Sequence, residues 1–227
     1  MATHETAVNG MTLDRAGMED QLAQSARHFI DCAFDGEDLS RLDLQGCTFE
    51  RCTFADTNLF ASKLARSTWR RCRAGSADFE SVDAVDANFE GCDLNNTKWR
   101  RAKLASATYR GCKLTGASFE EVAHLGLTFE DSLLVGADLR GFSFRKAILK
   151  QLDFSDAYLA GCDFREAVFE GGSLRNATIK LAKFQGADLR GADIDGFKLS
   201  EAALLKGAVI THAQAANFMR ALDLVVI

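Results

Sequence analysis

Apolar side chains recur at every fifth position over most of the chain, from Phe29 to Val209. Of the 37 positions in this phase, 34 carry Phe, Leu, Ile, Val, Trp or Tyr, and the exceptions are Ala74, Ala84 and His124. An α-helix repeats its buried face about every 3.6 residues and a β-strand about every 2, so a period of five fits neither. Long-range self-similarity of this kind is typical of a solenoid.

A second, longer interval shows how many pentapeptides make one turn. The residue that follows the central apolar one alternates in sign when it is sampled at every fourth pentapeptide: Glu50, Arg70, Glu90, Arg110, Glu130, Lys150, Glu170 and Arg190. Stacked strands lie about 4.8 Å apart, so neighbours of opposite charge would attract one another. The sequence therefore predicts an all-β solenoid of about nine square coils, with one pentapeptide on each side and the central residue pointing inward.

Composition removes several function classes from consideration. The chain has no proline, which suits continuous β stacking because proline cannot donate a ladder hydrogen bond. The seven cysteines all lie two residues before a central position, a slot that otherwise holds small residues, so we expect buried fillers rather than disulfides or metal ligands. No phosphate-binding loop, nucleophile elbow or metal-ligand spacing is present, and we expect neither an enzyme nor a cofactor.

The net charge of −5 is mild, and no apolar run is long enough to cross a membrane. The first residues have neither the charged region nor the apolar region of a secretory signal, and a cytoplasmic location is the resulting expectation. His124 leaves two alternatives open. It is either an inward neutral side chain with a backbone partner or part of a bulge that turns it outward.

Both ends of an open stack need caps, because they expose unpaired backbone groups. We expect an N-terminal segment or cap over 1–26, the β-helix over 27–210 and a helix-strand module over 211–227. Thr211 and Gln214 form a capping box, and Leu224–Ile227 is expected to form a short strand. This module is either a simple cap or an end-to-end homodimer interface. The interface would contain Ala215, Phe218, Met219, Leu222, Leu224 and Val226.

Several stretches follow an Ala-Asp-Leu-x-Gly pattern, among them 137–141, 187–191 and 192–196. In this respect the chain resembles the pentapeptide repeat proteins, and the resemblance implies a right-handed quadrilateral β-helix. The tail, with Gln214, the run 218–222 and the apolar end, resembles the C-terminal module of the Qnr and MfpA type. The five-residue repeat of this chain is never interrupted, whereas Qnr proteins carry loops between their coils. In this respect the chain is more similar to MfpA.

This second resemblance implies a function. Proteins of the Qnr and MfpA type form homodimers, bind DNA gyrase or topoisomerase IV, and protect these enzymes from quinolones or related poisons by imitating duplex DNA. The implied function is thus topoisomerase protection, with inhibition as a further outcome. The alternative is a non-enzymatic interaction rod with another protein partner. Direct nucleic-acid binding is not expected, because both tryptophans of the basic-aromatic stretches are in the inward phase.

One of the four predicted sides carries seven acidic and three basic residues, while the other three sides are nearly balanced or basic. With Asp188 around the corner, this side would form an acidic stripe for partner binding. Its members are Asp35, Asp56, Asp93, Asp153, Asp156, Asp188, Asp193 and Asp195. The alternative interpretation is an ordinary solvated face.

Overall fold

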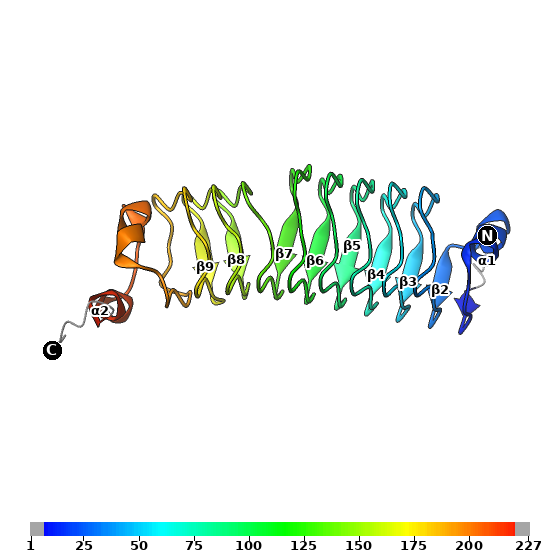
Figure 1. Ribbon diagram of the computed structural model, residues 1–227, viewed down its shortest axis with the longest axis horizontal. Coiled ribbons are helices and arrows are strands. Elements are labelled where there is room, and N and C mark those ends of the chain that lie inside the picture. The colour runs from blue at the N-terminus through cyan, green and yellow to red at the C-terminus, as the bar shows by residue number, and fades with distance from the viewer. Residues whose placement is uncertain (1–6, 221–227) are drawn as a thin grey trace, which may run out of the picture. The chain divides into compact units, whose positions relative to one another are not determined.

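The computed structural model describes residues 7–220 and divides into unit 1, Met1–Thr128, and unit 2, Phe129–Ile227. Unit 1 contains β1 (Val8–Asn9), α1 (Arg15–Ala23), β2 (His28–Ile30), β3 (Thr48–Glu50), β4 (Thr68–Arg70), β5 (Asn88–Glu90) and β6 (Thr108–Arg110). Strand β7 (Thr128–Glu130) spans the division. Unit 2 contains β8 (Ile148–Lys150), β9 (Val168–Glu170), the 3-10 helix η1 (Leu199–Leu205) and α2 (His212–Arg220). Figure 1 shows the strands of each unit side by side in chain order.

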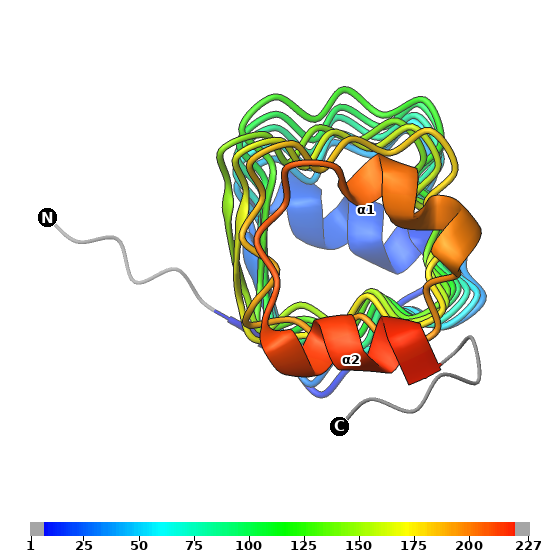
Figure 2. The same ribbon diagram turned by 90° about the vertical axis from the view of Figure 1, so that its left-hand side faces the viewer.

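The strands are parallel, and their register advances by four pentapeptides per coil. Phe49 pairs with Trp69 in unit 1, and Leu149 pairs with Phe169 in unit 2. Isolated bridges with the same offset, such as that between Asp43 and Lys63, continue the ladder on the other sides. The predicted quadrilateral β-helix is confirmed, with about eight turns, and Figure 2 shows the four-sided outline of the coils.

The sides are named here in chain order. Side 1 is centred on Phe29 and every twentieth residue after it and contains the strands. Sides 2, 3 and 4 are centred in the same way on Phe34, Leu39 and Leu44. At each corner, two residues after a central position, the backbone turns with a positive φ, as at Arg71 (52°) and Gly91 (62°). Proline could not adopt this conformation, which is a second reason for its absence.

Aromatic rings fill the axis of unit 1. The rings of Phe89 and Tyr109 stack at 4.7 Å, and those of Phe79 and Trp99 stack at 4.1 Å. Trp69 contacts Phe79 edge-on at 5.9 Å. These two large side chains occupy the same coil as the two small central alanines, so large and small residues compensate one another. In the same coil Val82 is buried and Val85 is half-buried.

All seven cysteines are buried and free, which confirms their role as small fillers. The thiol of Cys52, for example, donates to the carbonyl of Phe29 at 3.4 Å. Hydrogen bonding with Cys52, together with burial, raises the pKa of the Cys72 thiol to about 12. Burial raises the pKa of Cys162 to the same value. These thiols therefore remain protonated and unreactive at neutral pH.

The predicted charge columns are present on the outer surface, although not every member pairs along the stack. Arg70 contacts Glu90 at 3.7 Å, and Lys150 contacts Glu130 at 3.4 Å. In contrast, Arg190 binds Asp188, two residues before it on the same side, at 2.6 Å. The alternation therefore places opposite charges one above the other in each column. A cation can still pair with a carboxylate on its own coil when that carboxylate is closer.

The two ends depart from the repeat. Near the N-terminus, β1 pairs with β2, so the predicted cap over 1–26 contributes a strand to the ladder in addition to α1. At the other end, η1 replaces part of a regular coil, and Val209 pairs with Asp188, one position beyond the regular offset. Val209 is 46% exposed, so the prediction that the inward phase extends to this residue is wrong.

The half-buried His124 has its Nδ1 3.2 Å from the carbonyl oxygen of Val122, as expected of a histidine with a backbone partner.

Candidate partner-binding surface

Side 2 of unit 2 gathers four aspartates within three coils. Asp153 and Asp193 each precede a central residue, and bridges from both to Ser173 place them in a single column. Asp156 occupies a corner with a φ of 57°, and Asp195 follows a central residue. Three of the four side chains are exposed and Asp153 is half-buried. The repeat therefore presents these carboxylates outward as one surface, which we call the acidic side.

Local hydrogen bonds orient this surface without neutralising it. Asp153 accepts a hydrogen bond from the amide of Ser155, and Asp193 accepts one from the amide of Asp195, both at 2.9 Å. Within residues 7–220, none of the four aspartates forms an ion pair with a lysine or an arginine. Arg175 is the single basic residue among the side 2 positions of this unit. The acidic side therefore retains most of its negative charge.

Acids on the other sides of unit 2 behave differently, because most of them face a cation. Ion pairs engage Glu130, Asp138, Asp163, Glu166 and Asp188. The guanidinium of Arg165 holds the pKa of Asp163 at about 2, and Arg190 lowers the pKa of Asp188. Asp188, which we predicted as a member of the acidic stripe, thus lies on side 1 with its charge compensated.

In unit 1 the same side is nearly neutral. Asp35 uses its carboxylate within the fold, accepting from the hydroxyl of Thr53 at 2.7 Å and from the amide of Ala55 at 2.6 Å. Asp93 lies in a bridge column between Arg73 and Lys113. Asp56 is exposed at a corner. The sequence places all three on side 2, but only unit 2 concentrates uncompensated acids there.

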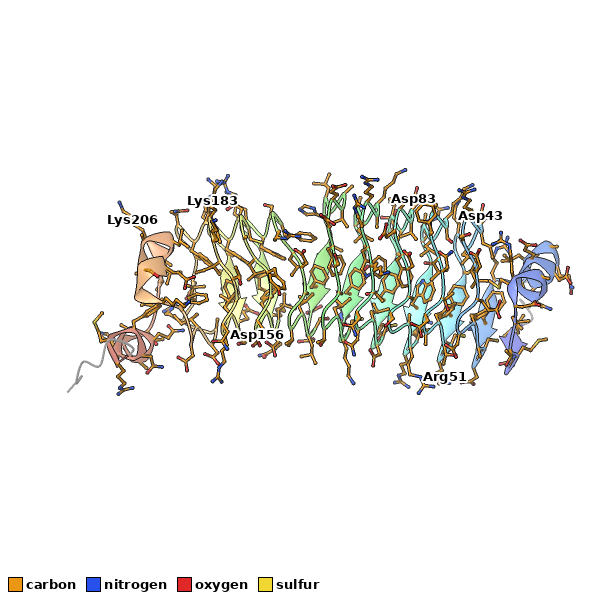
Figure 3. All side chains as sticks on the ribbon, in the orientation of Figure 1. Asp43, Arg51, Asp83, Asp156, Lys183 and Lys206 are labelled. Atoms are coloured by element: carbon orange, nitrogen blue, oxygen red, sulfur yellow. The ribbon has the colours of Figure 1, made fainter. Side chains whose placement is uncertain are left out.

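The opposite side of unit 2 has the reverse charge. Five basic residues lie on side 4, with two acids, Asp163 and Glu166, among them: Arg145, Lys146, Arg165, Lys183 and Lys206. Figure 3 shows Lys183 and Lys206 at one edge and Asp156 at the other. Charge totals along the whole of each side do not show how strong the basic excess of side 4 is within unit 2. Separate sums for each half of the repeat would have shown it.

Helix α2 anchors beside the acidic side. The predicted capping box is present, with the amide of Gln214 donating to the hydroxyl of Thr211 at 3.1 Å and the amide of Thr211 donating to Gln214 Oε1 at 2.7 Å. The side-chain amide of Gln214 also donates to the carbonyls of Leu189 and Ala192, both at 2.8 Å. These bonds hold α2 along one edge of the last coil, as Figure 2 shows.

The structure describes only part of the predicted dimer interface. In α2, Ala215 and Phe218 are half-buried, and Met219 is 40% exposed. The remaining predicted members, Leu222, Leu224 and Val226, and the predicted strand over 224–227 lie outside the described residues. Asn217 links the helix to the acidic side, because its amide donates to the carboxylate of Asp195 at 3.0 Å.

We also searched residues 7–220 for membrane-spanning helices and for metal-binding clusters. In the part of the chain that the structure describes, no helix is long and apolar enough to span a membrane. Residues 7–220 also contain no group of three or more His, Cys, Asp or Glu side chains placed to hold a metal ion.

Comparisons with known proteins agree with this architecture. A model described as "Pentapeptide repeat region" matches residues 25–99, and one described as "Pentapeptide repeats (8 copies)" matches 85–120, 126–165 and 157–196. No curated protein sequence matches the chain. Among solved structures, a trypsin-treated form of QnrB1, a plasmid-mediated fluoroquinolone resistance protein, is 21% identical, with a TM-score of 0.75. That match covers 87% of this chain and 99% of the other.

The full-length form of QnrB1 is 20% identical, with a TM-score of 0.58, and the match covers 96% of this chain and 97% of the other. At this level of identity the likeness shows the fold alone.

Proposed function

Because the chain belongs to the pentapeptide repeat family, we propose that it is a partner-binding protein that protects a type II topoisomerase, DNA gyrase or topoisomerase IV, from quinolone-like poisons. The acidic side of unit 2 would be the contact surface, in place of a stretch of duplex DNA. Bound at high occupancy, the same surface would also inhibit the enzyme by competing with its DNA.

One observation carries this proposal, namely the four uncompensated aspartates Asp153, Asp156, Asp193 and Asp195. An acid already paired to an arginine must lose that partner before it can attract another cation, whereas these four carboxylates form no ion pair with a lysine or an arginine within residues 7–220. A channel lined with Lys and Arg binds DNA mainly through its phosphates. A rigid column of carboxylates can occupy such a channel, and its association rate would fall steeply as salt is added.

QnrB1, which shares the fold of this chain, is a fluoroquinolone resistance protein, and this supports the choice of a type II topoisomerase as the partner. It does so only through a shared fold, so the test must be made on this protein. The experiment is a supercoiling assay with purified gyrase, with and without a quinolone, at low and at moderate salt. We expect the protein to restore supercoiling in the presence of the drug. No protection and no inhibition at micromolar protein and low salt would refute the proposal.

The contribution of the acidic side is tested by a fourfold variant, Asp153→Asn, Asp156→Asn, Asp193→Asn and Asp195→Asn. We expect it to lose gyrase binding by at least about tenfold, since each exposed charge adds only a fraction of a kcal/mol to about 1 kcal/mol. A matched control removes four paired acids from other sides of the same unit, Glu130→Gln, Asp138→Asn, Asp163→Asn and Glu166→Gln. Equal losses in both variants would mean that net charge, rather than the acidic side, controls binding.

We further propose that α2 contributes to a homodimer. Phe218 is half-buried although α2 lies at the end of the stack, so part of its ring is open to a partner. Phe218→Asp should yield monomers in sedimentation velocity experiments, because a carboxylate cannot be buried unpaired. A variant that still sediments as a dimer would exclude this helix from the interface.

A second candidate function is binding to a protein other than a topoisomerase. The observation that favours it lies on side 1 of unit 2, where the cross-strand neighbours Ile148 and Val168 are 59% and 39% exposed. A contact centred on these residues would be apolar and insensitive to salt. Ile148→Asp together with Val168→Asp would abolish such a contact but leave topoisomerase protection intact, which separates the two candidates.

A further inference from the structure

A groove with a volume of about 560 Å³ lies on the outer surface of unit 1, along the corner between sides 1 and 2. Three arginines line it: Arg70, Arg71 and Arg110. Glu50 and Glu90 also line it, and each forms an ion pair with an arginine. Glu90 contacts Arg70 at 3.7 Å, and Glu50 forms a close ion pair with a neighbouring arginine outside the groove. With three arginines and two glutamates, the lining carries a net positive charge, and Glu90 occupies one of these arginines, Arg70.

Arg71 differs from two other corner arginines, Arg51 and Arg101, which have carboxylate partners. Arg51, one coil earlier, forms two hydrogen bonds of 2.9 Å with Asp31. Arg101, at a corner of side 3, donates to Glu121, one coil later, at 2.9 Å. Within residues 7–220, the Arg71 guanidinium has neither an ion pair nor a side-chain hydrogen bond.

The reason lies in the residues above and below Arg71 in its column. The residue one coil earlier is Arg51, a like charge, and the residue one coil later is Gly91, which has no side chain. The side chain of Arg71 extends toward that glycine, because a Cβ at position 91 would lie 3.6 Å from Arg71 Cγ. The next corner in the column, Gly111, is also a glycine. The space that a carboxylate would fill, as Glu121 does for Arg101, is thus part of the open groove.

We propose that this groove binds a small multivalent anion, with a phosphate or carboxylate group of the ligand on the guanidinium of Arg71 above Gly91. The planar guanidinium offers paired donors to either group, and charge-assisted bonds of this type are the stronger ones in proteins. Arg70 and Arg110 at the rim would add attraction at longer range. This site lies in unit 1 and does not depend on the acidic side, so it stands or falls separately from the proposed function.

The test is an NMR titration of the full-length protein that follows the arginine Nε–H resonances at low, constant ionic strength. The probes are inorganic pyrophosphate and citrate, which separate a phosphate preference from a carboxylate preference. We expect a saturable shift of the Arg71 resonance with at least one probe, and no saturable shift with either would overturn the proposal. Arg71→Gln should weaken binding by at least about tenfold.

Arg66→Gln is the matched control for that variant. Arg66 is also an exposed corner arginine, with a φ of 58°, but it does not line the groove. If Arg66→Gln weakens binding as much as Arg71→Gln does, the probes respond to general surface charge and the site is wrong.

A second variant supplies the missing carboxylate from the chain itself. Gly91→Glu places an acid one coil after Arg71, the arrangement that Arg101 and Glu121 already have. Corner positions accept glutamate at a positive φ, as Glu121 (56°) and Glu166 (61°) show. We expect Gly91→Glu to fold and to abolish anion binding. Gly136→Glu adds the same charge at an open corner of unit 2 and should leave binding unchanged; loss of binding in this control would contradict the proposal.

Discussion

Units 1 and 2 use the same five-residue repeat but differ in what fills the axis and in how charge is distributed outside. Unit 1 has stacked Trp, Tyr and Phe rings along its core, and acids and bases alternate on its surface. Unit 2 has fewer aromatic rings on side 1, an acidic side 2 and a basic side 4. The inward residues specify the coil in both units, so the outward residues can differ without changing the backbone. Recognition can therefore be localised in one unit while both share a fold.

The largest expected effect is the loss of an aromatic ring from the core of unit 1. Trp69 is fully buried and contacts Phe49, Phe54, Phe79 and Phe89. Trp69→Ala should lower the free energy of unfolding by about 3–5 kcal/mol, through lost burial and the cavity left behind. Leu149→Ala in unit 2 should cost about 2–4 kcal/mol. Urea denaturation followed by circular dichroism measures both, and a cost below about 1 kcal/mol for Trp69→Ala would refute the role given to the aromatic core.

A smaller effect is expected from a methyl group added at a crowded position that follows a corner of unit 2. A Cβ at Gly172 would lie 2.1 Å from the carbonyl oxygen of Leu152, in a backbone with a φ of +84°. Gly172→Ala should therefore destabilise by about 2–4 kcal/mol, from overlap together with the strained conformation. Gly136→Ala, where nothing lies within 4 Å of the added Cβ, should cost about 1 kcal/mol. Equal thermal unfolding midpoints for the two variants would show that the coils yield to admit the methyl group.

The smallest effect concerns the ion pairs that set the other sides of unit 2 apart from its acidic side. The pKa of Asp163 is lowered to about 2 because Arg165 hydrogen-bonds its carboxylate. A lowered pKa means that the pair stabilises the folded state above the unfolded carboxyl pKa of about 3.9, and that this contribution disappears as the pH falls toward 2. Since Arg165 is partly exposed, Asp163→Asn should cost at most about 1 kcal/mol at pH 7.

This cost should shrink between about pH 4 and pH 2, which urea denaturation across that range would measure. Asp153→Asn is the comparison, because Asp153 has no lysine or arginine partner within residues 7–220 and should change stability by less than about 0.5 kcal/mol. A pH-independent cost for Asp163→Asn would contradict the assigned ion pair.

The sequence predicted the coil because its signals are periodic and local. The five-residue apolar phase identified the inward residues, the charge alternation at every fourth pentapeptide identified the number of sides, and Thr211 with Gln214 identified the start of α2. The η1 helix was not predicted, because Leu199 and Leu204 continue the apolar phase. Within residues 7–220 no regular coil follows this segment, and its backbone forms short-range bonds such as that from the amide of Glu201 to the carbonyl of Lys198.

The candidate surface was predicted less completely, for a related physical reason. Counting charges identifies which side a carboxylate lies on, but not which cation it contacts. Asp188 was placed in the acidic stripe, and only coordinates show that Arg190 binds it at 2.6 Å. The groove beside Arg71 was missed because it depends on absent side chains at Gly91 and Gly111, and glycine is also the ordinary corner residue of the repeat.

The corner geometry has a consequence for how such chains can change in length. Removing one pentapeptide within unit 2, for example 157–161, would leave every inward position inward, so the protein would still fold. Every later residue would nevertheless move back by a quarter of a turn, and Asp193 would no longer stack over Asp153. Only insertions or deletions of whole turns, four pentapeptides at a time, keep both the core and the pattern of chemistry on each side. The number of residues between two surface groups thus determines the angle between them about the axis of the coil.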